Sequence, residues 1–146
     1  MIQRSKVYAY ITRNEQILVF RHVDFPEAGI QVPGGTLHQG ELPERAVLRE
    51  VVEETGLEAI RLESYLGCDE YHLQENEAEE IHLRHFYHLI CEQDTPHTWQ
   101  HYEHYRSDYQ PEPILFEFYW LPIPAAIETL HPYYSAKIGQ LLENPS

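Results

Sequence analysis

Residues 35–57 read GTLHQGELPERAVLREVVEETGL and pass from a glycine turn into a helical pattern. Placed about 100° apart, the residues divide into an apolar and an acidic half. The apolar half contains Val47, Leu48, Val51 and Val52, and the other contains Ala46, Arg49, Glu50, Glu53 and Glu54. This pattern predicts one amphipathic helix with an acidic face.

The ends of this helix are marked by Pro43 and Gly56. Proline is tolerated in a first turn, where no amide hydrogen bond is lost, and glycine suits the left-handed residue that stops a helix. We therefore expect a helix over residues 43–55. Leu42 precedes it and cannot accept a hydrogen bond from the first helical amides, so the helix lacks a side-chain cap.

Three glutamates of the helix, Glu50, Glu53 and Glu54, stand at positions i, i+3 and i+4, so their carboxylates converge within one turn. Arg49 is the one nearby cation in this segment. A divalent cation can offset such crowding, and hard carboxylate oxygens favour magnesium or manganese. The alternative is a solvated acidic face, the usual meaning of a charge run.

The remaining sequence predicts strands on both sides of this helix. Polar and glycine-containing breaks separate β-rich runs, and proline breaks interrupt a helical spacing at the carboxyl end. The predicted strands are residues 7–11, 17–21, 31–35, 60–68, 81–91 and 114–121, the last helical stretch is 125–142, and residues 93–112 are expected to form a long surface loop. The order predicts a mixed α/β (α+β) sandwich.

Length and charge narrow the class of protein. A chain of 146 residues suits one domain over residues 1–146. The formal net charge of −14 argues against binding DNA, which requires a basic surface. Because no apolar run approaches the roughly 20 residues of a membrane span and no secretory signal is visible, we expect a cytoplasmic protein without a membrane partner.

The segment resembles the signature box of the Nudix hydrolases position by position. The matching residues are Gly35, Glu41, Arg49, Glu50, Glu53, Glu54 and Gly56, with Val51 and Leu57 at the aliphatic positions. No element of the box is missing. The resemblance implies a Nudix-type α/β/α sandwich with a mixed sheet, and its layout covers nearly the whole chain.

The resemblance also implies roles for these residues. Mg²⁺ or Mn²⁺ would be held by Glu50, Glu53, Glu54 and the carbonyl of Gly34. Glu50 is the favoured general base, with Arg49 orienting it, while Glu41 would assist through water. Relatives also place a base or ligand on a later loop, where the candidates are Glu103, Asp108, Glu112 and Glu117; of these, Glu117 stands out.

Residues outside the box must select the substrate. Arg21 ends the second predicted strand, where some relatives contact substrate, although a surface arginine is the more ordinary reading. The aromatic side chains of Trp99, Tyr102 and Tyr105 offer stacking surfaces for a base, or simply pack on the domain. Glu117 alternates with the apolar residues of its strand and therefore faces away from them.

We therefore expect a metal-dependent hydrolase that cleaves a diphosphate linkage in a small nucleoside di- or triphosphate, nucleotide sugar or related compound. One alternative is an RNA 5′-end pyrophosphohydrolase, with a basic patch from Arg4, Lys6, Arg13 and Arg21. Another is a nucleotide sensor that does not cut, although such modules usually lose box carboxylates. Many relatives are dimers, so a homodimer is one possible oligomeric state that the sequence does not decide.

Overall fold

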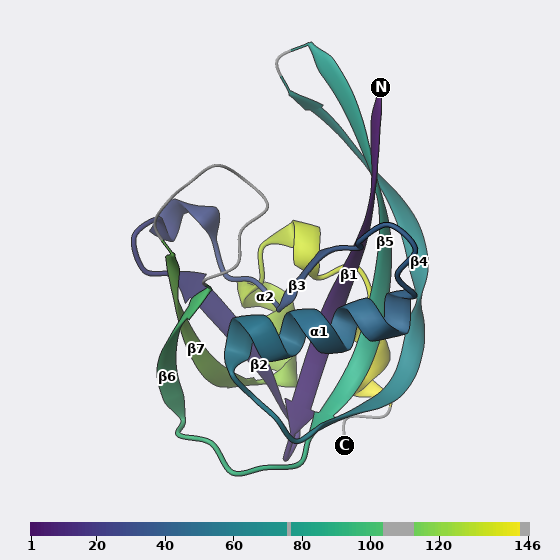
Figure 1. Cartoon of the computed structure of the whole chain (residues 1–146). Coiled ribbons are helices and arrows are strands. Elements are labelled where there is room, and N and C mark those ends of the chain that lie inside the picture. Colours follow the sequence, from purple (N-terminus) through teal and green to yellow (C-terminus); the bar gives the residue numbers. More distant parts are fainter. Residues whose placement is uncertain (76, 104–112, 144–146) are drawn as a thin grey trace.

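The computed structural model describes residues 1–75, 77–103 and 113–143 (Figure 1). The strands are β1 (Ile2–Arg13), β2 (Gln16–His22), β3 (Gly34–Thr36), β4 (Ile60–Glu75), β5 (Ala78–Cys91), β6 (Thr98–Glu103) and β7 (Ile114–Pro122). The helices are α1 (Pro43–Thr55) and α2 (Ile123–Thr129), with short 3₁₀ turns η1 (Pro26–Ala28), η2 (Pro132–Tyr134) and η3 (Ile138–Leu142). No helix within these ranges is long and apolar enough to cross a membrane.

The strands form one mixed sheet in the order β4-β5-β1-β2-β7-β6, with β3 beside β1. β1 and β5 are parallel, and the other pairs are antiparallel. A tight turn at Asn14 and Glu15 joins β1 to β2, and both residues have positive φ. Away from this turn β2 diverges from β1, and β3 takes its place with Thr36 opposite Lys6 (Figure 1).

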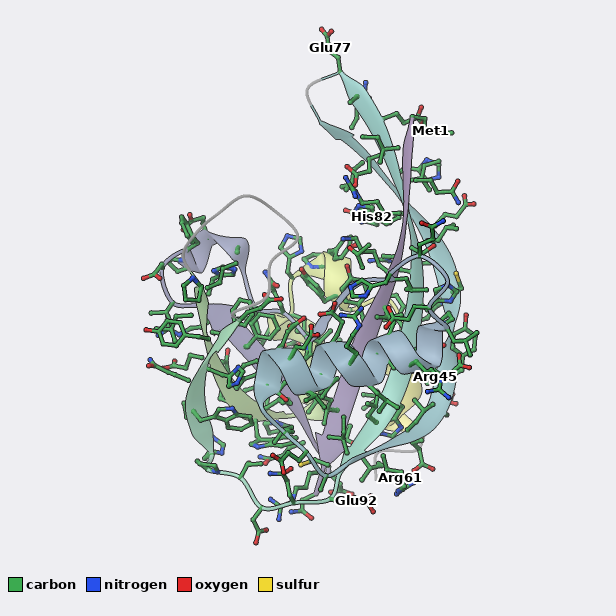
Figure 2. All side chains as sticks on the ribbon, viewed as in Figure 1. Met1, Arg45, Arg61, Glu77, His82 and Glu92 are labelled. Atoms are coloured by element: carbon green, nitrogen blue, oxygen red, sulfur yellow. The ribbon has the colours of Figure 1, made fainter. Side chains whose placement is uncertain are left out.

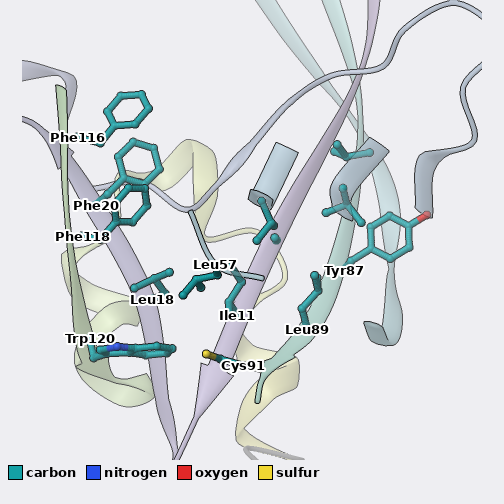
Figure 3. Packing of buried hydrophobic residues seen from close by; sticks show 14 of the residues in the cluster. Ile11, Leu18, Phe20, Leu57, Tyr87, Leu89, Cys91, Phe116, Phe118 and Trp120 are labelled. Atoms are coloured by element: carbon teal, nitrogen blue, oxygen red, sulfur yellow. The ribbon is translucent and has the colours of Figure 1, made fainter. Parts of the chain in front are cut away.

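Helices cover both faces of the sheet. On one face, Val47 and Val51 of α1 join a core that includes Ile11 and Leu18, and Figure 3 shows this cluster continuing to the aromatic residues of β7. On the other face, Ile123 and the C-terminal turns pack against residues of β1, β2 and β5. The predicted α/β/α sandwich is confirmed.

Helix α1 has the predicted bounds, residues 43–55. Leu42 makes no side-chain capping hydrogen bond, as its apolar chemistry requires. Gly56 adopts a left-handed conformation with φ of 78°, and its amide donates to the carbonyl of Val52. Few non-glycine residues adopt this conformation without cost, so the glycine ends the helix.

Strands β4 and β5 extend well beyond the predicted ranges of 60–68 and 81–91. Their register continues outward through Tyr71 opposite His82 and forms an arm that projects from the body (Figure 1). Ile2 at the start of β1 pairs with Glu80 on the arm. Most of the additional residues are polar, and backbone pairing rather than apolar burial keeps them in strands.

The predicted loop over residues 93–112 is wrong at residues 98–103, which form the strand β6. Its side chains alternate between exposed and half-buried, but the half-buried positions are Trp99, His101 and Glu103 rather than aliphatic residues. An edge strand requires burial on one face only, so this polar composition concealed it. The C-terminal stretch is also less helical than its spacing suggests, since 3₁₀ turns follow α2.

Candidate active site

Two glycines of β3, Gly34 and Gly35, lie against β1 and α1. The amide of Gly34 donates to Oε1 of Glu54 at 3.3 Å. A Cβ at Gly35 would lie 2.4 Å from the carboxyl carbon of Glu50, closer than atoms can pack. Glu50 and Glu54 are consequently buried, at 8% and 3% exposure, between the helix and β3. The absence of a side chain at Gly35 leaves the space that the Glu50 carboxylate occupies, whereas a Cβ at Gly34 would meet the Tyr8 ring and the carbonyl of Val7.

Arg49 connects three acids of this segment. It makes two hydrogen bonds to Glu41, at 2.7 and 2.9 Å, and its Nη1 reaches Glu50 at 3.0 Å and Glu53 at 3.3 Å. Hydrogen bonding from Arg49 lowers the pKa of Glu41 to about 2. Its Nη2 also donates to the carbonyl of Thr36, which fixes the guanidinium between α1 and β3. Glu41 is thus positioned to orient Arg49, and Arg49 to orient Glu50.

A third carboxylate joins Glu50 and Glu54 from outside the helix. It belongs to Glu103 at the end of β6, and one oxygen from each of the three residues lies within 4.8 Å of the others. The alternation that points Trp99 and His101 toward α1 also points Glu103 there: Trp99 Nε1 donates to the carbonyl of Thr55 at 3.0 Å. This period-two pattern was the available sequence signal.

The local charge is poorly balanced. Burial is the main cause that raises the pKa of Glu54, followed by the charges of Glu103 and Glu50. Burial also raises the pKa of Glu50, although Arg49 opposes the shift. Among the described residues, no lysine or arginine forms an ion pair with Glu54. Three crowded carboxylates in a glycine-lined recess fit a hard divalent cation such as Mg²⁺ or Mn²⁺.

The other expected ligands lie differently. The Glu53 carboxylate contacts Arg49, is 33% exposed and is not part of the group of three. Gly34 lines the adjacent cavity, and its amide donates to the carboxylate of Glu54. The structure thus brings together Glu50, Glu54 and Glu103 and leaves Glu53 at the edge.

The carboxylates open into a cavity of about 530 Å³, within the usual range for small-molecule sites. One wall comes from β1 and carries cations, and another comes from β2 and β7 and carries rings. The lining residues are Arg4, Lys6, Tyr8, Phe20, His22, Gln31, Val32, Gly34, Gly35, Thr36, Leu37, His38, Glu50, Glu54, Glu103, Ile114, Phe116 and Tyr134.

The residues expected to contact substrate do not line this cavity in the described part of the chain. Arg21 and Glu117 face each other on β2 and β7 and form an ion pair at 2.8 Å. The Trp99 ring stacks on Phe118, with centroids 5.5 Å apart. Tyr102 is 48% exposed, and Tyr105 lies outside the described residues, as do Asp108 and Glu112.

The aromatic wall was missed by the sequence prediction. Phe20 and Phe116 stand on neighbouring strands with ring centroids 4.5 Å apart, and both line the cavity. The His22 ring meets Phe116 edge-on at 5.0 Å. Strand alternation places Phe20 and His22 on one face, but it does not show that β2 leaves β1 and exposes that face to the cavity.

The sequence matches the family model described as NUDIX domain over residues 2–140. No curated protein matches the chain. Similar solved structures include the ORF135 protein of E. coli (20% identity, 98% of this chain and 91% of that chain, TM-score 0.66). They also include the MutT protein of Methanosarcina mazei Go1 (19%, 97% and 94%, 0.66) and the dihydroneopterin triphosphate pyrophosphohydrolase of E. coli (17%, 99% and 99%, 0.63). At these identities the similarity shows a shared fold.

Proposed function

The chain belongs to the Nudix hydrolase family, and from this premise we propose that it hydrolyses the diphosphate linkage of a small nucleoside di- or triphosphate derivative with Mg²⁺ or Mn²⁺. The observation that carries the proposal is the group of three carboxylates, Glu50, Glu54 and Glu103, within 4.8 Å at the cavity. Diphosphates are anions that a purely acidic recess repels, so substrate binding and metal binding must occur together at this place.

The metal would be held by Glu50, Glu54 and Glu103, with Glu53 close enough to contribute through water. When bound, it offsets phosphate charge and lowers the pKa of a water molecule. Glu50 is the candidate general base, because Arg49 holds one of its oxygens in place at 3.0 Å. In the reaction, the oxygen of water bonds to phosphorus, the bridging P–O bond breaks, and the departing phosphate keeps the electron pair.

The nucleoside part of the proposal rests on the opposite wall. Phe20 and Phe116 present rings to a cavity large enough for a nucleotide-sized ligand, and flat aromatic surfaces suit a heterocyclic base. A structural neighbour described as a dihydroneopterin triphosphate pyrophosphohydrolase acts on a ring joined to a phosphate chain. A cavity with carboxylates on one wall and rings on another supports a substrate that has phosphates at one end and a ring at the other.

The test is turnover of a panel of nucleoside triphosphates, nucleotide sugars and dinucleoside polyphosphates with Mg²⁺ and Mn²⁺. We expect Glu54→Gln and Glu103→Gln each to lower kcat/KM by roughly 10²- to 10³-fold, the usual range for loss of an electrostatic or acid–base group. Glu44→Gln is the matched control, because Glu44 is an exposed acid of the same helix. Full turnover by either site variant, or metal-independent turnover, contradicts the proposal.

A further inference from the structure

The cavity has a cationic wall that the carboxylates do not explain. Arg4 and Lys6 are two residues apart on β1, so they share a face, and both line the cavity. They are the cations among its described lining residues, in a protein with a formal net charge of −14. A place where positive charge collects in such an acidic chain is a candidate site for an anion.

Lys6 is fixed without being neutralised. Its Nζ donates to Thr36 Oγ1 at 2.8 Å, and the side chain is half-buried. No carboxylate of the described chain forms an ion pair with it. An ammonium has three donors, so two remain after the bond to Thr36. Burial and the neighbouring charge of Arg4 lower the pKa of Lys6, and the charges of Glu80 and Glu50 offset this shift only in part.

Arg4 is held through one side of its guanidinium group. Its Nε donates to Oε1 of Glu80 at 2.7 Å, and His82 Nε2 contacts the same oxygen at 3.0 Å. Figure 2 shows His82 at the base of the arm, where β5 runs beside β1. The terminal nitrogens of Arg4 make no hydrogen bond to the described residues and stay available as a fork, the geometry that suits a phosphate.

The cationic wall stands beside the carboxylates and away from the rings. Thr36 links the two charged regions, since its hydroxyl accepts from Lys6 and its carbonyl accepts from Arg49. The rings of Phe20 and Phe116 lie on the diverging strands β2 and β7. The spatial order across the cavity is therefore cations on β1, then carboxylates on α1 and β6, then the rings of Phe20 and Phe116 on β2 and β7.

We propose that Arg4 and Lys6 bind the terminal phosphate of the substrate, so that the enzyme prefers compounds with an uncapped phosphate end, such as nucleoside triphosphates, to nucleotide sugars. This inference rests on the proposed function and narrows its substrate class. A sugar in place of the terminal phosphate would bring a neutral, bulky group against two cations and leave Lys6 without an anionic partner and Arg4 with Glu80 alone. The departing phosphate or pyrophosphate stays against this wall after the P–O bond breaks.

The same chemistry occurs at the 5′ end of RNA, but the wider surface favours a small molecule. Arg13 lies nine residues from Arg4 along β1, about 30 Å away, and pairs with Asp94. Arg21 pairs with Glu117. The basic patch of Arg4, Lys6, Arg13 and Arg21 is therefore not assembled, and within residues 1–75, 77–103 and 113–143 no continuous basic track leads away from the cavity for a polynucleotide to follow.

The experiment compares kcat/KM for UTP with UDP-glucose and for GTP with GDP-mannose, in the wild type and in Lys6→Met. We expect the wild type to prefer the triphosphates. Lys6→Met should lower their kcat/KM by roughly 10- to 100-fold, the worth of a charged hydrogen bond, mainly through KM. The nucleotide sugars should change by less than about threefold. Lys137→Met is the matched control, since Lys137 is the other lysine and lies near Gly67, outside the cavity.

Binding of a methylene-bridged triphosphate analogue, measured by calorimetry, provides a readout that is independent of turnover. The affinity should fall in Lys6→Met by the same factor of roughly 10 to 100. Lys6→Arg, which keeps the charge, should restore much of the binding, and it replaces Lys6→Met as the decisive variant if that protein fails to fold. A wild-type preference for nucleotide sugars, or equal losses on both substrate types, overturns the inference. Faster hydrolysis of a 5′-triphosphorylated RNA than of any free triphosphate overturns it in favour of RNA.

The two proposals fail in different ways. If no diphosphate compound is hydrolysed with either metal, the proposed function is wrong. The binding of inorganic tripolyphosphate to the wild type and Lys6→Met then still tests the cationic wall. If both substrate types are hydrolysed equally well and Lys6→Met changes neither, the proposed function stands and the terminal-phosphate inference is wrong.

Discussion

Two arginines, Arg49 and Arg84, differ in the charge around them. Carboxylates outnumber the cation at Arg49, whereas Arg84 is paired with a single carboxylate. Arg49 contacts Glu41, Glu50 and Glu53, so one cation meets three carboxylates. Glu54 and Glu103 add further negative charge beside Glu50, and all three carboxylates line the cavity.

Arg84 lies on β5 opposite Asp69 of β4 and is almost fully buried, with a side chain 4% exposed. It forms two hydrogen bonds of 2.8 Å with the single carboxylate of Asp69. The rings of Tyr71, Phe86 and Tyr133 surround its guanidinium, with centroids 4.6 to 5.1 Å from Cζ. At this site one cation pairs with one carboxylate, and aromatic rings enclose the guanidinium.

The difference indicates which cluster serves stability and which serves chemistry. A balanced and enclosed pair fixes the C-terminal turn against the sheet, since Arg84 also donates to the carbonyl of Tyr133. An unbalanced group beside a cavity costs folding energy, and such strain is common at functional sites. We therefore expect substitutions at Arg49 to reduce activity and substitutions at Arg84 to reduce stability.

The largest expected effect comes from Arg49→Met. Without the guanidinium, Glu50 loses its orienting hydrogen bond and Glu41 loses its partner, so kcat/KM should fall by about 100-fold or more. Steady-state kinetics on the best substrate of the panel measure the loss. Arg45→Met is the control on the same helix, because Arg45 is exposed (Figure 2). An equal loss in both variants would remove the special role of Arg49.

The next effect is the loss of stability in Arg84→Met. Removing one partner of a buried ion pair costs about 3 kcal/mol, and the partial exposure of Asp69 places this case at the lower end of the usual range. Urea unfolding followed by circular dichroism measures it. Activity well below the unfolding temperature should change by less than about threefold. The double variant Arg84→Met with Asp69→Leu removes both charges and should recover much of the loss.

The smallest expected effect concerns His88, a buried titratable side chain whose hydrogen-bond partner is a neutral hydroxyl. It is 2% exposed, its Nε2 lies 2.7 Å from Thr12 Oγ1, and burial lowers its pKa below the ordinary value of 6.5. The folded protein therefore binds this proton less readily than the unfolded chain. Its contribution to stability is complete above pH 6.5 and is lost as the pH falls through the folded pKa.

Unfolding of the wild type and His88→Gln at pH 7.5 and pH 5.5 measures this contribution. The wild type should lose more stability between the two values, with a slope of at most about 1.4 kcal/mol per pH unit from one group. Because other acids and histidines titrate in both proteins, only the difference between the two curves is assigned to His88. Parallel curves would show that its ionisation is not linked to folding.

Much of the site was predictable because its elements are local. The bounds of α1, the inward acids and the glycine stop all depend on residues within one turn of each other, and helical geometry fixes their relative positions. The α/β/α layers likewise follow from apolar patterns that require burial on both sheet faces. The roles of individual box residues in catalysis stay predictions.

The features that the sequence did not indicate depend on contacts that join distant segments. Glu117 was favoured over Glu103, yet sheet pairing gives Glu117 to Arg21 and turns Glu103 toward Glu54. Both acids alternate within strands, so the period-two pattern could not separate them without knowledge of which face meets α1. The Trp99 ring, for which stacking on a base and packing on the domain were both open, contacts the end of that helix.

The sequence by itself determined the acidic helix and the turn of glycines beside it, because the backbone sets the spacing of residues three and four apart. Only the tertiary structure decided that Glu103 completes the acidic group and that Lys6 and Arg4 face rings across a cavity. Those residues are brought together by the divergence of β1 from β2 and by the pairing of β6 with β7. Such long-range pairings depend on how the whole sheet closes its hydrogen bonds and buries both faces, and no short stretch of sequence contains that information.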